Sequence, residues 1–208
     1  MRKKLIIGSG GHARVVWSCM NLLKNNKIDG FIDIEYSGKS EEIYNIKVIG
    51  GLDMLNNYKP DETDVFLAIG DNRKRKEVYQ FLSLRKFNMP NLIHPSSVVC
   101  SSVSIGEANF IGPYVHIGPD VFIGNANIIN SYANIEHQSS VESFVHCAPG
   151  STICGKSKIY DEVLIGANST IIQNLTVSLG TKIGAGAVII EDIVEKNQTF
   201  VGVPGKKI

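Results

Sequence analysis

The chain has 208 residues, with 21 basic and 20 acidic side chains and a formal net charge of +1. This charge balance argues against a nucleic-acid or membrane-surface partner, and the length allows one large domain or two small ones. The apolar run from Leu5 to Ile7 is too short for a signal peptide or a membrane span. The four cysteines lack CxxC or Cys/His metal spacing, so we expect reduced thiols, no metal site and a cytoplasmic protein.

The first ninety or so residues alternate predicted strands and helices, which is typical of a parallel sheet with right-handed crossovers. The predicted strands cover Lys4–Ile7, Phe31–Ile34 and Asp64–Ile69. The predicted helices run from the glycines after the first strand to about Asn25, over Leu52–Tyr58 and over Asn72–Phe87. Residues at helical spacing support the first and last helix: Val15, Cys19, Leu22 and Leu23, then Val78, Phe81, Leu82 and Arg85. Prolines near residues 90 to 96 mark a boundary, which predicts domains at 1–92 and 93–208.

A glycine-rich turn, GSGGHA from Gly8 to Ala13, lies between the first predicted strand and the first helix. Its G-x-G-x-x-A pattern lets backbone N–H groups approach a phosphate at a helix N-terminus, as in Rossmann-like domains. Asp33 lies twenty positions after Ala13, where a carboxylate can accept hydrogen bonds from ribose hydroxyls. The competing interpretation is a tight turn with a solvated aspartate. A dinucleotide needs two βαβαβ halves and this region holds one, so a mononucleotide is favoured over NAD.

A basic run, Arg73 to Lys76, opens the last of these helices. Cations at a helix N-terminus oppose the helix dipole, which hints at a bound anion. We favour a solvated helix face and assign this run no phosphate role.

From Val99 to Ile189, every sixth residue is aliphatic and β-branched, except Cys147. The next residue is often glycine, as at Gly106 and Gly166. A period of six fits neither a helix nor a single strand, but it fits a parallel β-helix in which each short face buries one aliphatic residue. The period breaks at Glu195.

The repeat blocks and three longer segments carry a resemblance over essentially the full chain: IIGSGGHARVV, IEHQSSVESFVHCAPGSTICG and FVGVPGKKI. The chain resembles the hexapeptide-repeat acyltransferases, in the subfamily of bacterial sugar acetyltransferases that includes sialic acid O-acetyltransferases and UDP-4-amino-sugar N-acetyltransferases. The resemblance implies an α/β Rossmann-like domain followed by an all-β left-handed parallel β-helix. It also implies acetyl-CoA as the acetyl donor and a homotrimer with active sites between subunits.

In the resembling family, the first domain holds the nucleotide diphosphate of an activated sugar. The positions that match its nucleotide-sugar site are Gly10, Gly11, His12 and Asp33. His12 would donate to a phosphate; the competing role is a cap on the first helical turn. The base of the nucleotide stays open.

His137, in NIEHQ, matches the family's catalytic histidine. It lies two residues after the core residue Ile135, so its side chain need not point into the core, and an imidazole suits a general base near neutral pH. Without the family, a surface histidine is the simpler interpretation. The family usually continues with Asp or Glu, whereas Gln138 accepts the ring N–H without adding charge, so we expect a weaker base. Glu136 is the alternative source of charge, although adjacent strand residues point to opposite faces.

The resemblance also implies an acetyl-CoA groove. The matching positions are His146, Asn130, Ala167 and Ala185, the two alanines through backbone groups. Nine residues separate His146 from His137, so the two lie on different faces of the repeat and would meet across a subunit boundary. We interpret His94 and His116 as structural.

An acetyl-cysteine intermediate on Cys147 or Cys154 is less favoured. Cys147 takes a core position, where a thiol serves as a small hydrophobic group, and neither cysteine has a base beside it in the sequence.

The leading hypothesis is an acetyl-CoA-dependent N-acetyltransferase acting on the 4-amino group of a nucleotide-linked amino-deoxy sugar for surface glycan biosynthesis, with direct transfer and His137 as general base. One alternative is O-acetylation of a sugar such as sialic acid. Another is a non-catalytic β-helix scaffold. The sequence leaves the nucleotide and the sugar open.

Overall fold

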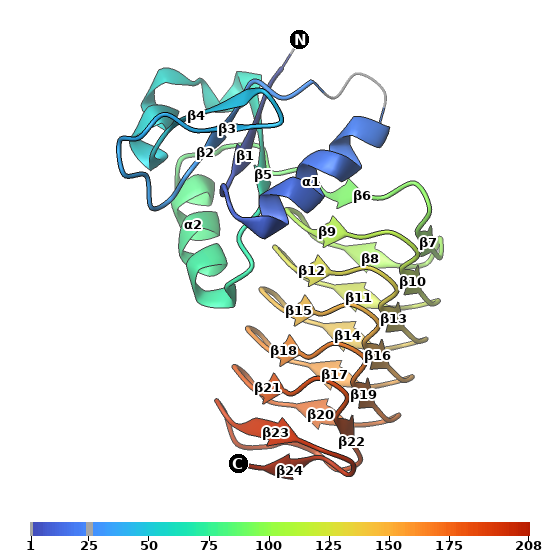
Figure 1. Ribbon diagram of the computed structural model, residues 1–208. Coiled ribbons are helices and arrows are strands. Elements are labelled where there is room, and N and C mark those ends of the chain that lie inside the picture. The colour runs from blue at the N-terminus through green and yellow to red at the C-terminus, as the bar shows by residue number, and fades with distance from the viewer. Residues whose placement is uncertain (1, 24–26) are drawn as a thin grey trace. The chain divides into compact units, whose positions relative to one another are not determined.

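The computed structural model describes residues 2–23 and 27–208, so the predicted helix end near Asn25 lies outside the described residues. The chain forms two compact units, Met1–Leu92 and Ile93–Ile208, each with its own sheets and core (Figure 1). Within the described residues, no helix is both long enough and apolar enough to cross a membrane.

The first unit is built on one sheet with the strand order β3-β4-β2-β1-β5. Its strands are β1 (Lys3–Ile7), β2 (Gly30–Ile32), β3 (Glu42–Ile43), β4 (Ile46–Gly50) and β5 (Thr63–Leu67). Four of them run parallel, which confirms the predicted α/β sheet, and β3 pairs antiparallel with β4. The β3–β4 hairpin was not predicted; its turn residues Tyr44 and Asn45 have φ values of 52° and 62° without any glycine to signal them.

The helices of this unit are α1 (Gly11–Leu22), α2 (Asn72–Leu84) and the 3₁₀ helices η1 (Leu52–Asn57) and η2 (Pro60–Glu62). The buried face of α1 consists of Ala13, Val16, Cys19 and Met20, whereas Val15 and Leu22 are exposed, so the predicted apolar stripe was wrong by part of a turn. Helix α2 ends before the predicted Phe87, because Lys86 takes a φ of 60° and the N–H of Phe87 bonds back to the carbonyl of Leu82.

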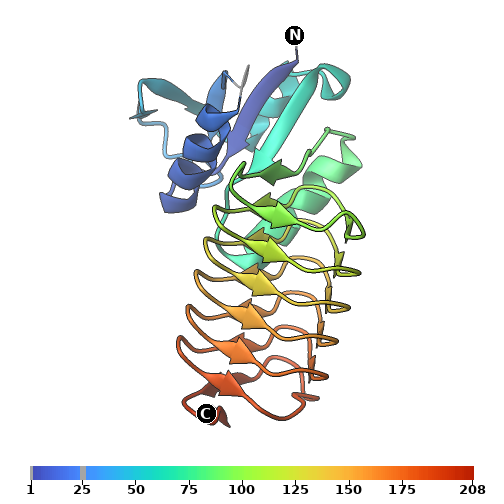
Figure 2. The same cartoon turned by 90° about the vertical axis from the view of Figure 1, so that its right-hand side faces the viewer.

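The second unit is the left-handed parallel β-helix that the resemblance implied, with coils stacked on one another (Figure 2). Its first face is formed by β7 (Val98–Val99), β10 (His116–Ile117), β13 (Asn134–Ile135), β16 (Thr152–Ile153), β19 (Thr170–Ile171) and β22 (Val188–Ile189). Its second face is formed by β8 (Ser104–Ile105), β11 (Phe122–Ile123), β14 (Ser140–Val141), β17 (Lys158–Ile159) and β20 (Thr176–Val177). Its third face is formed by β6 (Leu92–Ile93), β9 (Phe110–Ile111), β12 (Ile128–Ile129), β15 (His146–Cys147), β18 (Leu164–Ile165), β21 (Lys182–Ile183), β23 (Thr199–Val201) and β24 (Lys206–Lys207).

Each strand pairs with the strand three hexapeptides further along the chain, as Ile117 does with Ile135, so one hexapeptide from each face makes one coil. The sixth-residue positions form the core: those from Ile111 to Ile189 are buried, and Val99 and Ile105 pack against them partly buried. The predicted core is therefore confirmed.

From Ala108 (60°) to Gly186 (69°), each corner between two faces has one residue with positive φ, so these residues also recur every six positions. Most of them are not glycine. The small residues that the sequence predicted lie two residues before each positive-φ position. They are small because a larger side chain would collide with the next coil: a Cβ on Gly166 would lie 2.5 Å from the backbone nitrogen of Ala185. We number the corners by the faces that they join: residues 136–139 lie at the first-to-second corner, and residues 130–133 at the third-to-first corner.

The last coil is shortened where the period was predicted to break. Ile193 forms a β-bridge with Val177, and Phe200 pairs with Ile183. Ile193 and Phe200 each come earlier in the chain than a full coil of three hexapeptides after their partners would place them. The core thus continues through Ile193 and Phe200, although the chain has left the six-residue period.

Candidate active site

The carboxyl ends of three strands meet at one edge of the first unit's sheet, where Ile7 pairs with both Ile32 and Leu67. A cavity of about 400 Å³ opens at this edge. Its lining comes from the segments that follow the three strands: Gly8, Ser9, Gly10, Gly11, His12, Asp33, Ile34, Glu35, Ala68, Ile69, Gly70 and Lys74. The fold therefore brings together all four residues predicted for the nucleotide sugar, at the position where open α/β sheets bind ligands.

The glycines that line this cavity differ in whether the fold itself requires them. Gly8 has a φ of +120°, and a Cβ there would lie 2.5 Å from the carbonyl oxygen of Ala68, so the fold itself requires it. A Cβ on Gly10 or Gly11 would meet no protein atom within 4 Å. Gly10 caps α1 without a side-chain hydrogen bond, so no capping side chain stands between the first turn and an anion.

The other two predicted residues, Asp33 and His12, line the same cavity. Asp33 directly follows β2, and its Oδ1 accepts a hydrogen bond from the N–H of Glu35 at 3.0 Å, which orients the carboxylate. His12 is the second residue of α1, and the cap position itself belongs to Gly10.

The basic run at the start of α2 is not uniformly solvated, which corrects the expectation for Arg75. Its side chain is 1% exposed, and its guanidinium donates to the carbonyls of Ile69 and Gly70 at 2.9 and 3.1 Å. Burial lowers the pKa of Arg75 to about 9, while the charge of Asp71 acts in the opposite direction. Arg75 thus holds one wall of the cavity.

His137 lies exposed at the first-to-second corner of the β-helix. Its Nδ1 is 3.3 Å from Oε1 of Gln138, which is a long hydrogen bond. The ring lies over Gly155 in the next coil, where a Cβ would come within 2.7 Å of Cε1 and Nε2. Gln138 itself is the positive-φ residue of this corner, with a φ of 58°.

Glu136 points along the first face of the β-helix. Its Oε1 accepts a hydrogen bond from Nδ2 of Asn134 at 2.8 Å. In the next coil, burial and then the charge of Glu136 raise the pKa of Cys154. The carboxylate that we expected as an alternative partner of His137 is thus bonded to Asn134, while the imidazole Nδ1 faces Gln138.

The four residues predicted for acetyl-CoA gather along a different edge, at and beside the third-to-first corner. They are Asn130, His146, Ala167 and Ala185. His146 lies on β15 between Ile128 and Leu164 of the adjacent strands, and the two alanines occupy the same position in successive coils. The first face separates this edge from His137 within one chain, so the structure brings the four together but not with the predicted base.

Two residues at the third-to-first corner were not predicted. Tyr114 and Tyr132 stack with ring centroids 5.0 Å apart, and both are exposed. In the sequence they are separated by one full coil of three hexapeptides, and this spacing was the available signal.

Both candidate cysteines are held as neutral thiols. Cys147 is fully buried, and burial raises its pKa to about 12. A thiol is a poor nucleophile, so direct transfer is favoured over an acetyl-cysteine. Among residues 2–23 and 27–208, no group of three or more His, Cys, Asp or Glu side chains is placed to hold a metal ion.

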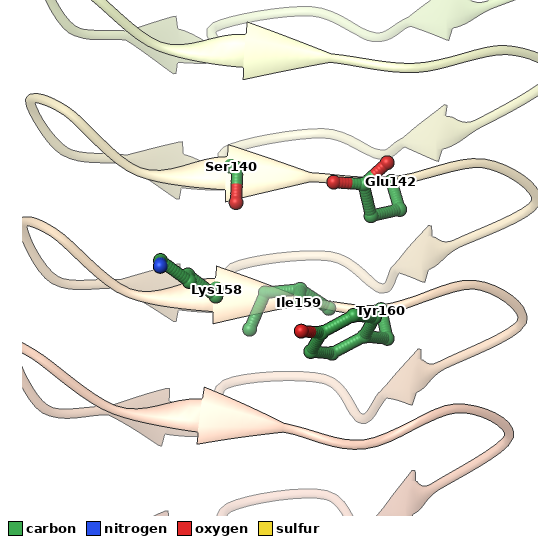
Figure 3. Close-up of a pocket in the computed structure, with 5 residues that line it drawn as sticks. All are labelled: Ser140, Glu142, Lys158, Ile159 and Tyr160. Carbon is green, nitrogen blue, oxygen red and sulfur yellow. The ribbon is translucent and has the colours of Figure 1, made fainter.

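A second hollow, of about 300 Å³, lies on the second face and contains none of the predicted site residues (Figure 3). Ser140 and Glu142 of the coil that includes β14 line it with Lys158 and Tyr160 of the next coil. Burial, followed by the charge of Asp161, raises the pKa of Glu142.

Comparison with known proteins finds a family that matches the first unit and relatives that match a larger part of the chain. Residues 3–82 match the family described as the PglD N-terminal domain. The chain is 30% identical over 115 residues to the UDP-N-acetylbacillosamine N-acetyltransferase of Bacillus subtilis, a match that covers 53% of this chain and 51% of the relative. The chain thus spans about half the length of the curated relatives that it matches first.

Several solved structures resemble the whole chain. The acetyltransferase domain of PglB from Neisseria gonorrhoeae shares 30% identity, with a TM-score of 0.92 and full coverage of both chains. A histidine mutant of perosamine N-acetyltransferase from Caulobacter crescentus, in complex with CoA and GDP-perosamine, shares 28% identity, with a TM-score of 0.93, covering 100% of this chain and 97% of that one.

Proposed function

This chain belongs to the hexapeptide-repeat sugar N-acetyltransferases, and we propose that it transfers the acetyl group of acetyl-CoA to the 4-amino group of a nucleotide-linked amino-deoxy sugar. The observation that carries the proposal is the presence of two sites in one chain: a glycine-lined cavity suited to phosphate and an exposed histidine at a β-helix corner. We further propose that the enzyme works in the cytoplasm, where it supplies a sugar for surface glycans.

The first unit would bind the nucleotide. Gly10 and Gly11 leave space for a diphosphate against the N-terminus of α1, since no protein atom lies where their Cβ atoms would be. His12 would donate to a phosphate oxygen, and Asp33 would accept hydrogen bonds from the ribose hydroxyls. Arg75 would stabilise this site by donating hydrogen bonds to the carbonyls of Ile69 and Gly70, which line the cavity.

The β-helix would carry out the transfer. Because the amide Oε1 of Gln138 only accepts hydrogen bonds, it selects the tautomer of His137 with the proton on Nδ1 and leaves Nε2 free to act as the base. As the sugar amine attacks the thioester carbonyl, the new C–N bond forms, Nε2 takes the amine proton, and the C–S bond breaks to release CoA as the thiolate. The protonated His137 then donates the proton that it took from the amine to the thiolate sulfur of CoA, which restores the neutral imidazole.

The acetyl donor would lie along the edge formed by Asn130, His146, Ala167 and Ala185. The small side chains of the two alanines leave their backbone accessible to a long, thin ligand. This edge and His137 lie on opposite sides of the first face, so one chain does not complete the site. We propose a homotrimer in which the first-to-second corner of one copy meets the third-to-first corner of the next.

The first face supports this assembly by its composition. Its outward strand residues are mostly uncharged, such as Val98, Thr152, Thr170 and Val188, and Glu136 lies at the adjoining first-to-second corner. A face of this kind is suited to burial between copies of the chain.

The experiment that tests the function is mass spectrometry after incubation of the chain with acetyl-CoA and a panel of UDP-, GDP- and dTDP-linked 4-amino sugars. We expect one panel member to gain one acetyl group. Sialic acid forms a separate arm, and acetylation there without nucleotide affinity would favour the O-acetyltransferase alternative. No transfer in any arm would favour the scaffold alternative.

The role of His137 is tested by His137→Ala, with His94→Asn as the matched control. Loss of a general base lowers kcat by about 10²–10⁴-fold. The control changes a histidine whose Nδ1 accepts from the N–H of Ser96 at 3.1 Å, a bond that an asparagine oxygen can replace. Near-normal kcat in His137→Ala, with the oligomer intact by analytical ultracentrifugation, would remove His137 as the base.

A further inference from the structure

Two tyrosines form an exposed stack on the β-helix, and neither the core nor the proposed chemistry uses them. Tyr114 and Tyr132 lie at the third-to-first corner in successive coils, with ring centroids 5.0 Å apart and an angle of 16° between the ring planes. They are 60% and 64% exposed. Their separation is close to the spacing of adjacent strands, so the rings lie above one another along the β-helix.

The two tyrosines take the positive φ that recurs at the corners of the β-helix. Tyr114 and Tyr132 have φ values of 57° and 59°, in the left-handed region that disfavours bulky side chains. Other coils place Gly150, Asn168 and Gly186 at the same corner position, the residue types that the region favours. Two aromatic residues thus stand at positions that local conformation disfavours, and they do not gain burial in return. Two large aromatic rings left exposed side by side point to a role in binding.

The stack lies at one end of a run of smaller residues along this corner. The residue that follows Tyr132, one coil further, is Gly150, and a Cβ there would lie 2.2 Å from Oδ1 of Asn168. Further along the same edge, Ala167 and Ala185 have small side chains that project little from the backbone. The edge is therefore lined by small residues over three coils and becomes aromatic at the coil that contains Asn130.

We infer that the Tyr114–Tyr132 stack holds the ring of the acceptor sugar, an inference that rests on the proposed function. A sugar ring presents a C–H face that packs on an aromatic ring. Tyr132 is two residues from Asn130 and one coil from His146, so the stack continues the edge assigned to the acetyl donor. The small residues accommodate the arm of acetyl-CoA, and the tyrosines mark the point where the donor ends and the acceptor begins.

The test is the double variant Tyr114→Asn/Tyr132→Asn. Asparagine is chosen because Asn168 already occupies this corner position with a φ of 54°, so the fold is retained. The second variant, Tyr114→Phe/Tyr132→Phe, keeps the stack without its hydroxyls. The matched control is Tyr160→Asn, which removes a tyrosine that is 47% exposed on the second face.

In an active enzyme, we expect the asparagine variant to raise KM for the nucleotide amino sugar by roughly tenfold, the scale of one lost aromatic contact. KM for acetyl-CoA and the Kd of the free nucleoside diphosphate stay at wild-type values. The phenylalanine variant and the Tyr160→Asn control retain the wild-type KM for the sugar.

Three results would overturn the inference: an unchanged KM for the sugar, a raised KM for acetyl-CoA instead, or dissociation of the oligomer in analytical ultracentrifugation. The last would make the stack a contact between copies. A wild-type chain that transfers no acetyl group would instead remove the proposed function itself, so the two failures are distinguishable.

Discussion

The imidazole Nδ1 of His137 lies 3.3 Å from Oε1 of Gln138, so the side chain that orients the proposed base carries no charge. The resembling family usually has a carboxylate at this position. The backbone conformation of Gln138, with a φ of 58°, is shared by Glu162, with a φ of 60°, at another corner. A glutamate is therefore compatible with the local conformation, which makes the effect of charge testable in isolation.

Gln138→Glu should raise the plateau of the pH–rate profile and move its acid limb to higher pH. A carboxylate beside the ring stabilises the protonated imidazole, so His137 takes the amine proton more readily and also stays protonated to a higher pH. The measurement is kcat/KM for the sugar between about pH 5 and 9. A superimposable profile would mean that residue 138 does not act on the base.

Gly10→Ala and Gly166→Ala should have opposite effects on binding and stability. A methyl group on Gly10 meets no protein atom within 4 Å, so thermal stability is retained, but the space for a phosphate is lost and Kd for the preferred nucleotide rises roughly tenfold. A methyl group on Gly166 would lie 2.5 Å from the nitrogen of Ala185, so the β-helix loses about 1–3 kcal/mol of unfolding free energy. Calorimetry of unfolding and of UDP, GDP and dTDP binding separates the two.

Arg75→Ala should both destabilise the first unit and weaken nucleotide binding. The change leaves the carbonyls of Ile69 and Gly70 without the guanidinium donor and opens a cavity, a loss of about 2–4 kcal/mol in unfolding free energy. Arg73→Ala, at an exposed position of the same basic run, is the matched control and should change stability by less than about 0.5 kcal/mol. Unchanged nucleotide affinity in a folded Arg75→Ala chain would contradict the supporting role.

Cys154→Ala should retain kcat to within about twofold, because a thiol with a raised pKa is not the nucleophile. Rapid acid quenching followed by mass spectrometry of the protein should find no acetyl-enzyme in either form. An acetyl group trapped on Cys154, lost in the variant, would restore the covalent route.

Glu142→Gln should stabilise the β-helix at neutral pH and have no effect in acid. Burial and Asp161 raise the pKa of Glu142, so in the folded state its ionised form is disfavoured relative to the unfolded chain. This penalty is fully present above the folded pKa and disappears below the unfolded value of about 4.3. Thermal unfolding of both proteins at pH 7 and pH 3.5 checks the sign. A variant that is less stable than the wild type at pH 7 would contradict the assignment.

Local features of the chain predicted much of the site. The glycine turn and Asp33 were predicted together because a strand end, a turn and a helix start are all set by nearby residues, and parallel strands then align their carboxyl ends. The predicted solvation of Arg75 was wrong, because its burial depends on the loop of residues 69–70 that folds over it. The Tyr114–Tyr132 stack was missed because its members touch only across a full coil.

The sequence by itself determined the β-helix, because burying one aliphatic residue per face is a short-range requirement that leaves a strict six-residue period from Val99 to Ile189. It also determined the core positions. Only the tertiary structure decided which side chains share a corner, because neighbours across coils are three hexapeptides apart in the chain and the three faces divide the surface. The nine-residue spacing already predicted that His137 and His146 lie on different faces, whereas only the stacking of the coils brought Tyr114 against Tyr132 beside Asn130.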